Sequence, residues 1–209
     1  LVPGFLTAQG GAARLAVSHD APAPDSAYAF QPMPPGWHVT MGPGAVLTDA
    51  ANRAEGRFVV ESEIFLFPNS STAEYGIVLG RNGSEWTGFL ARRDGTAGIV
   101  RRASGSDTPL VPWAAHDSVP HPGAEPARVI LRVEAERDST HFLVNGQRIG
   151  ALPRTAAVEG VFGIRVGQGL HRAWGAPSGG SRKWRNSAVF GFGNKIAKKA
   201  LTVSLGLHL

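Results

Sequence analysis

The sequence predicts an all-β protein, an antiparallel β-sandwich of the jelly-roll type. Within residues 127–153, apolar and polar side chains alternate over residues 129–134, which is typical of a half-buried strand. A later apolar run in the same stretch ends at Asn145-Gly146, and this pair favours a type I′ hairpin because both central residues of that turn have positive φ. Turn signals recur at roughly 10–15 residues along the rest of the chain, as in sandwiches and jelly rolls.

Length and composition set the first limits. The chain has 209 residues, enough for one sandwich with a sizeable core or for two small domains. It has no cysteine, which excludes disulfides, thiolate zinc sites and cysteine nucleophiles. The 27 glycines and 15 prolines fit many short strands joined by turns. No apolar run of about 18 residues occurs, so we expect no transmembrane helix.

The charge is unevenly distributed and divides the chain. Residues 1–172 hold 15 Arg, no Lys and all 16 acidic residues, a net charge of −1. Residues 173–209 hold two Arg, four Lys and no acid, a net charge of +6, and we treat them as an atypical basic tail. Two explanations stay open: the reading frame departs from an ancestral sequence near residue 171, or the tail is genuine and contacts membrane or nucleic acid. For the domain itself we expect no nucleic acid partner.

The N-terminal segment, residues 1–27, is predicted to be a signal-peptide remnant followed by a linker. Leu1–Gln9 resembles the end of a secretory signal, with a small-residue cleavage pattern at Leu6-Thr7-Ala8, and a disordered terminus is the alternative. Ala21–Pro24 has the composition of a linker. The expected location is therefore secreted or periplasmic, with the sandwich domain over residues 28–172.

The first half of the domain contains four predicted strands. Two short ones within Phe30–Thr48 flank a Gly-Pro-Gly turn. Residues 56–67 form a long strand with one face composed of Phe58, Val60, Ser62, Ile64 and Leu66. Residues 74–80 form the next strand.

The second half continues the pattern. Residues 86–92 and 97–102 are expected to form a hairpin about Asp94-Gly95. Residues 104–126 contain five prolines and are predicted to be a loop. The meander over 127–153 follows, and residues 160–167 form one more strand. No helix is expected before residue 190, and residues 195–209 fit either a short helix or a strand.

Several segments together resemble the concanavalin A-like lectin/glucanase superfamily. More narrowly, they are similar to the laminin-G-like and 3-keto-disaccharide-hydrolase-like jelly rolls of secreted bacterial proteins, in which a strand ending in V-N-G precedes one carrying G-x-x-G-[IL]. Here these are Val144-Asn145-Gly146 and Gly160–Ile164. The resemblance covers residues 30–170 and implies two packed antiparallel sheets, one of them concave. The superfamily includes sugar binders, glycosidases and adhesive modules, so the fold does not fix the function. The remaining segments that carry the resemblance are Gly36-Trp37-His38, GRFVVESEIFLFP, EYGIVLG, FLARRDGTAGIVRR and EGVFGIRVGQGL.

Glu61 and Glu63 are the weak candidates for catalysis. They lie at i and i+2 on one strand face, so both would look into a groove on that side. Retaining glycosidases need two carboxyl groups about 5–5.5 Å apart. The catalytic branch of the resembled superfamily carries Glu-x-Asp-x-(x)-Glu on one strand, and the sequence from Glu61 lacks the middle Asp and the third acid. A solvated strand face is the favoured interpretation.

Aromatic residues near arginines form the preferred candidate site. Sugars stack on Trp and Tyr rings and form hydrogen bonds with Arg, Asn and Glu. The alternative for Trp37 and Trp86 is a place in the core or at its rim. The predicted function is an extracytoplasmic, non-catalytic module that binds carbohydrate or cell-envelope glycan; the alternatives are a glycoside-acting hydrolase and a purely structural domain. The candidate ligand-binding residues are Trp37, Tyr75, Arg81, Trp86, Arg92 and Trp113.

No metal site or other cofactor is predicted. The histidines of the domain show no H-x-H or H-x-x-x-H spacing, and the aspartates fall near turns, where Asp is expected for backbone reasons. No D-x-[DN]-x-[DN] loop is present, although structural calcium occurs in the resembled superfamily and stays the alternative. The sequence also lacks a G-x-S-x-G elbow and a phosphate-binding G-x-x-x-x-G-K loop.

Overall fold

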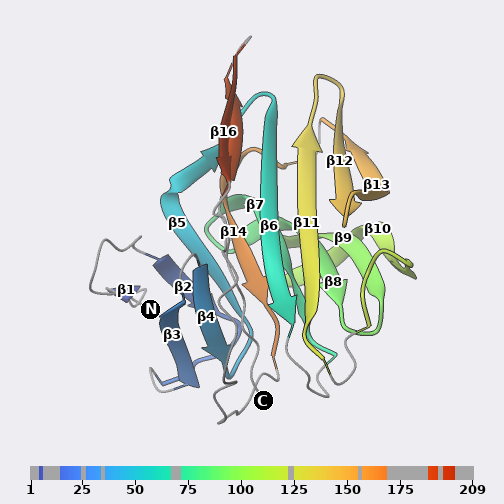
Figure 1. Ribbon diagram of the computed structural model, residues 1–209. Coiled ribbons are helices and arrows are strands. Elements are labelled where there is room, and N and C mark those ends of the chain that lie inside the picture. The colour runs from blue at the N-terminus through green and yellow to red at the C-terminus, as the bar shows by residue number, and fades with distance from the viewer. Residues whose placement is uncertain are drawn as a thin grey trace.

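The computed structural model shows a β-sandwich, with no α-helix among the residues that it describes (Figure 1). These residues are 5–6, 15–24, 27–33, 36–66, 72–121, 125–154, 157–168, 188–192 and 195–200. All strand pairings among them are antiparallel, which confirms the predicted fold class.

Two sheets form the sandwich and two hairpins accompany them. The larger sheet has the strand order β1 (Phe5–Leu6), β2 (Leu15–His19), β5 (Ala45–Ala54), β14 (Gly160–Val166), β7 (Glu74–Asn82), β8 (Glu85–Arg92), β9 (Thr96–Ala103) and β10 (Ser106–Ala115). The smaller sheet has the order β13 (Gln147–Pro153), β12 (Ser139–Val144), β11 (Ala127–Ala135) and β6 (Phe58–Leu66). The hairpins are β3 (Tyr28–Met33) with β4 (Gly36–Met41), and β15 (Ala188–Phe192) with β16 (Lys195–Ala200).

The core lies between the two sheets and follows the alternation of the sequence. In β6 the five residues of the predicted apolar face are all buried, and β11 buries Val129, Leu131 and Val133 beside them. Phe89 of the larger sheet meets Phe142 of the smaller one edge-on, with ring centroids 5.3 Å apart. Burying each large apolar side chain stabilises the fold by roughly 1.5–3 kcal/mol, so this face holds the two sheets together.

The turn at Asn145-Gly146 has the predicted geometry, with φ of 48° and 84°. The Asn145 side chain adds a hydrogen bond, since its Oδ1 accepts from the Ile130 backbone N–H at 2.8 Å. The hairpin between β8 and β9 is longer than a two-residue turn: Gly95 takes φ of 83° and its N–H donates to the Arg92 carbonyl at 3.2 Å.

The predicted loop over residues 104–126 is wrong in its first half, because residues 106–115 form β10 and pair with β9. Its prolines misled the prediction. A proline has no N–H to donate, but β10 is the outermost strand and needs hydrogen bonds on one side only. The register shifts between Pro109 and Val111 and again between Val111 and Ala114, so the strand is bulged.

Other boundaries also differ from the prediction. β2 pairs with β5, so the larger sheet begins inside the segment assigned to the leader and linker. The two strands that flank the Gly-Pro-Gly turn exist, but β4 pairs with β3 while β5 joins the larger sheet. Residues 195–200 form a strand rather than a helix, and the β15–β16 hairpin lies beside β6 (Figure 1). The suggested change of reading frame falls within residues 169–187, outside the described part of the chain.

The outer face of the larger sheet is strongly curved. Asp20, directly after β2, accepts a hydrogen bond from Arg102 of β9 at 3.2 Å. Five inter-strand spacings separate β2 from β9, which in a flat sheet would place them about 24 Å apart, beyond the reach of the two side chains. The outer face is therefore concave, as the superfamily resemblance implies.

Two glycines permit this curvature. A Cβ at Gly76 would lie 2.1 Å from the Phe89 carbonyl oxygen of β8, and one at Gly163 would lie 2.1 Å from the Leu47 carbonyl oxygen of β5. Both positions face backbone atoms, which cannot move aside without disturbing the strand pairing. Only glycine fits where neighbouring strands approach this closely.

Replacing Gly76 with alanine is expected to lower the free energy of unfolding by about 3 kcal/mol, because the added methyl group overlaps the β8 backbone. The matched control is Gly83→Ala, where φ is 60° but no atom lies within 4 Å of the new Cβ, and the backbone strain there costs about 1 kcal/mol. Denaturant unfolding of both variants measures the difference. Equal losses would contradict the steric account.

Candidate functional site

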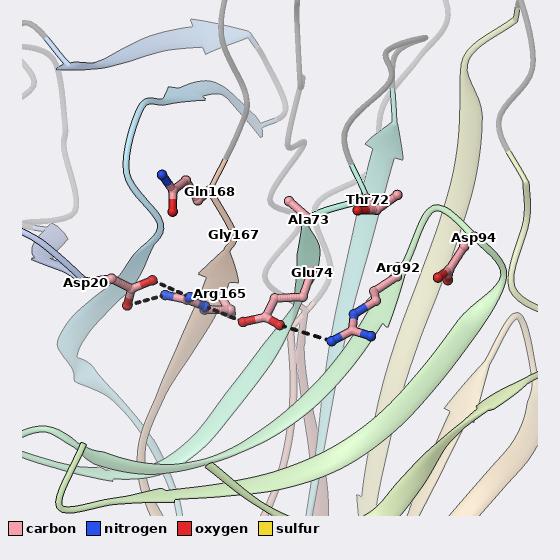
Figure 2. A pocket seen from close by; sticks show the side chains of 9 residues that line it. All are labelled: Asp20, Thr72, Ala73, Glu74, Arg92, Asp94, Arg165, Gly167 and Gln168. Carbon is pink, nitrogen blue, oxygen red and sulfur yellow. Dashed lines mark hydrogen bonds and ion pairs between the residues drawn. The ribbon is translucent and has the colours of Figure 1, made fainter. Parts of the chain in front are cut away.

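A pocket of about 420 Å³ opens at one end of the concave face (Figure 2). It lies where β2 and β14 end, where β7 begins, and where β8 turns toward β9. Its lining residues are Asp20, Thr72, Ala73, Glu74, Arg92, Asp94, Arg165, Gly167 and Gln168. The volume falls within the range of small-molecule sites.

Arg165, on β14, organises the pocket. Its side chain is only 4% exposed. Nη1 and Nη2 donate to the two carboxylate oxygens of Asp20 at 2.8 and 2.5 Å, and Nε donates to Glu74 Oε1 at 3.2 Å. All three guanidinium nitrogens are therefore engaged, and a single cation fixes the orientation of two carboxylates.

Charges of opposite sign alternate across the pocket. Figure 2 shows Asp20, Arg165, Glu74 and Arg92 in one row, coming from four different strands or strand ends. The last contact is loose, because Arg92 Nη2 lies 3.9 Å from Glu74 Oε2. Arg92 is thus the least constrained member of the row.

The pKa values of two carboxylates in the pocket, Asp20 and Asp94, are lowered. Burial alone raises the pKa of Asp20, but the hydrogen bonds and positive charge of Arg165, and then of Arg102, outweigh this and hold the pKa below its ordinary value of 3.8. The pKa of Asp94 is lowered chiefly by a hydrogen bond from the Thr96 hydroxyl. Both groups are therefore ionised at neutral pH and act as hydrogen-bond acceptors.

Two indole rings lie on the concave face beside the pocket. Trp86 extends across Gly88, where a Cβ would lie 2.6 Å from the ring, and Trp113 of β10 packs against Gly98, where a Cβ would lie 3.1 Å from the ring. An arginine covers each indole: the Arg92 guanidinium carbon lies 3.7 Å from the Trp113 ring centroid, and that of Arg102 lies 5.0 Å from Trp86. Both rings belong to an apolar cluster on this face, formed with Val46, Val78, Leu90 and Val100.

The structure brings together two of the six predicted ligand residues, Arg92 and Trp113. Trp86 is 3% exposed and lies beneath Arg102, so it belongs to the buried apolar cluster of the concave face. Arg81 is used internally: its guanidinium bonds to Ser18, Thr48 and the Gly83 carbonyl, and burial lowers its pKa.

The prediction that Tyr75 binds the ligand is corrected by the structure. It is 1% exposed and lies in the core between the sheets, because its position in β7 alternates with the outward-facing residues. Its ring therefore does not line the groove. Trp37 lies in β4, where the side chain is outside the described part of the structure.

The weak catalytic candidates Glu61 and Glu63 do not face the concave groove, and their placement agrees with the favoured interpretation, a solvated strand face. They lie on the outer face of the smaller sheet, where Glu61 pairs with Arg132 at 3.0 Å and Glu63 pairs with Arg128. The carboxylates that do face a pocket, Asp20 and Glu74, were missed. Residues 15–20 read LAVSHD, an apolar run followed by a polar one, so no alternation marks the strand that leads to Asp20.

Metal ligands do not gather within the part of the chain that the structure describes. No group of three or more His, Asp or Glu side chains there has an arrangement that holds a metal ion.

Comparison with known proteins places the fold. No protein-family model matches the sequence, and no curated protein does. Among solved structures, the carbohydrate-binding module CBM66 from Bacillus subtilis aligns with a TM-score of 0.55 and 11% identity, over 73% of this chain and 88% of that one. The chain has a jelly-roll β-sandwich fold. At this identity the similarity establishes the fold of the jelly roll alone.

Two other solved structures align with lower scores. A glycoside hydrolase family 16 endo-glucanase from Bacteroides ovatus aligns with a TM-score of 0.49 and 6% identity, over 74% of this chain and 81% of that one. Sheep galectin-11 aligns with a TM-score of 0.40 and 14% identity, over 59% and 88% of the two chains.

The ionised form of Asp20 is expected to stabilise the jelly roll. Because its pKa is lower in the folded than in the unfolded chain, this contribution is present above the unfolded value of 3.8 and disappears as the pH falls through the folded value. Urea unfolding of the wild-type chain and of Asp20→Asn, from neutral pH down to about pH 2, tests this. The difference in stability should shrink toward the acidic end. A constant difference would show that the Asp20 charge does not stabilise the fold.

Proposed function

We propose that the chain is an extracytoplasmic, non-catalytic module that binds carbohydrate or cell-envelope glycan in the pocket of the concave sheet. The observation that carries the proposal is the pair of carboxylates, Asp20 and Glu74, held toward one pocket by the buried Arg165. A site prepared in this way accepts hydrogen bonds from neighbouring hydroxyl groups, which are abundant on sugars.

The charge distribution favours a neutral, hydroxyl-rich sugar over an anionic one. Three of the five N–H groups of Arg165 donate to Asp20 and Glu74, and these two carboxylates balance its charge. The carboxylates of Asp20, Glu74 and Asp94 line the same pocket. Sulfate, phosphate or uronate groups would meet these negative charges, and only Arg92 has the freedom to balance them.

The fold similarity supports the same class of function. CBM66 is described as a carbohydrate-binding module, and its jelly roll covers most of the domain in this chain. None of the described segments forms a helix with the length and apolar character needed to cross a membrane.

A glycoside-acting hydrolase is the second candidate. Asp20 and Glu74 share one guanidinium, so two carboxylates lie close enough together to be compared with a glycosidase pair. Such an enzyme needs one carboxyl group with a raised pKa to protonate the leaving oxygen. The pKa of Asp20 is lowered rather than raised, so Asp20 does not suit this acid role.

A glycan array followed by calorimetry on the full chain tests the proposal. We expect binding to neutral glycans, with Asp20→Asn and Glu74→Gln each weakening the affinity about tenfold or more, because each removes a charged acceptor from the pocket. Glu61→Gln is the control, since Glu61 lies on the outer face of the smaller sheet.

Three outcomes would contradict the proposal. Binding that survives both pocket substitutions would place the ligand elsewhere. Release of reducing sugar by the wild-type chain, lost in Glu74→Gln, would favour the hydrolase. If the protein binds no glycan on the array, the result would favour a purely structural domain.

A further inference from the structure

We propose that Trp113 is a second sugar subsite, covered by Arg92 when no ligand is bound, and that the site therefore takes an oligosaccharide rather than a single sugar unit. This inference rests on the proposed function and extends the same site from the pocket toward β10.

The first observation is the position of the Trp113 indole. The ring packs against Gly98 on the concave face, where the missing side chain lets it approach the strand. The Arg92 guanidinium covers the ring at 3.7 Å from its centroid, in the place where the apolar face of a sugar would stack. The aromatic surface is therefore shaped for stacking but occupied by a charged side chain.

The second observation is how loosely Arg92 is held. Its nearest carboxylate contact, Nη2 to Glu74 Oε2, is 3.9 Å, which is too long for a hydrogen bond. Its side chain is also 35% exposed. A small rotation of Arg92 away from Trp113 and toward Glu74 would complete that ion pair, so uncovering the ring replaces one contact of Arg92 with another.

The second tryptophan of this face provides the contrast. Arg102 covers Trp86 in a similar way, but Asp107 holds it with two hydrogen bonds of 2.7 Å and Asp20 holds it with a third of 3.2 Å. Trp86 is 3% exposed. Of these two covered indoles, Trp113 is therefore the one whose cover is free to move.

Arg92 also connects the two parts of the site. It lines the pocket and covers the adjoining ring. An oligosaccharide that enters the pocket therefore continues directly over Trp113 once Arg92 has moved. One sugar unit would bond to the carboxylates, and the next would stack on the indole. Arg92 would then donate to Glu74 or to a ligand hydroxyl between them.

The test measures how affinity depends on ligand length. The probe is a series of one to four sugar units prepared from the polysaccharide with the strongest array signal, titrated by calorimetry into the full chain. We expect affinity to rise about tenfold from one unit to four in the wild-type chain. Trp113→Ala should remove this gain, Trp113→Phe should retain most of it, and Leu110→Ala, on the same edge strand, is the matched control.

A spectroscopic measurement separates stacking from indirect effects. In the chain labelled with 5-fluorotryptophan, the Trp113 fluorine signal is assigned by its loss in Trp113→Phe. The four-unit probe should shift this signal, and Arg92→Ala should shift it without any sugar, because the cover is gone.

The outcomes distinguish this inference from the proposed function. If Trp113→Ala keeps the gain with length, or if the fluorine signal does not move at saturation, the second subsite is refuted. The proposed function still stands in that case, provided that Asp20→Asn weakens binding to every member of the series. If no glycan binds, both proposals fail together.

Discussion

The site depends on one interaction, the contact of the buried Arg165 guanidinium with Asp20 and Glu74. These three residues lie far apart in the sequence, with separations of 145 and 91 residues between Arg165 and its two partners. The pocket therefore exists only when the N-terminal strand, the middle of the chain and the last strand of the larger sheet have come together. Removing either carboxylate leaves the buried Arg165 guanidinium with one partner in place of two, which costs stability. Stability and site geometry are thus linked through the same side chain.

Curvature of the larger sheet is the second requirement. Gly76 and Gly163 let neighbouring strands approach closely, and Gly88 and Gly98 leave room for indoles on the same face. Small residues on this face therefore serve two purposes, because they shape the sheet and make space for aromatic rings. The smaller sheet shows a different arrangement: its outer face carries paired arginines and glutamates, which neutralise one another.

Local patterns in the sequence predicted most of the sandwich. Alternation identified β6 and β11, and the apolar run that ends at Asn145-Gly146 identified β12 and its turn, because these signals depend on neighbours along the chain. The prediction of a loop at β10 was wrong because proline is tolerated on an outermost strand, and being outermost is a property of the whole sheet. Glu61 and Glu63 share a strand face, as predicted, but no local pattern shows that their strand belongs to the sheet opposite the concave one. No local signal marks Arg165, whose role comes from partners distant in sequence.

The prolines of β10 affect how separate molecules meet. An outermost strand normally offers a row of N–H and C=O groups on which a strand of another molecule can assemble, and this is a common start of aggregation. In β10, Pro109 and Pro112 each remove an N–H group, and the bulges beside them break the regular spacing of the others. Strand-on-strand stacking of copies is thereby disfavoured at the edge nearest to Trp113. The concave face can then stay accessible at high protein concentration.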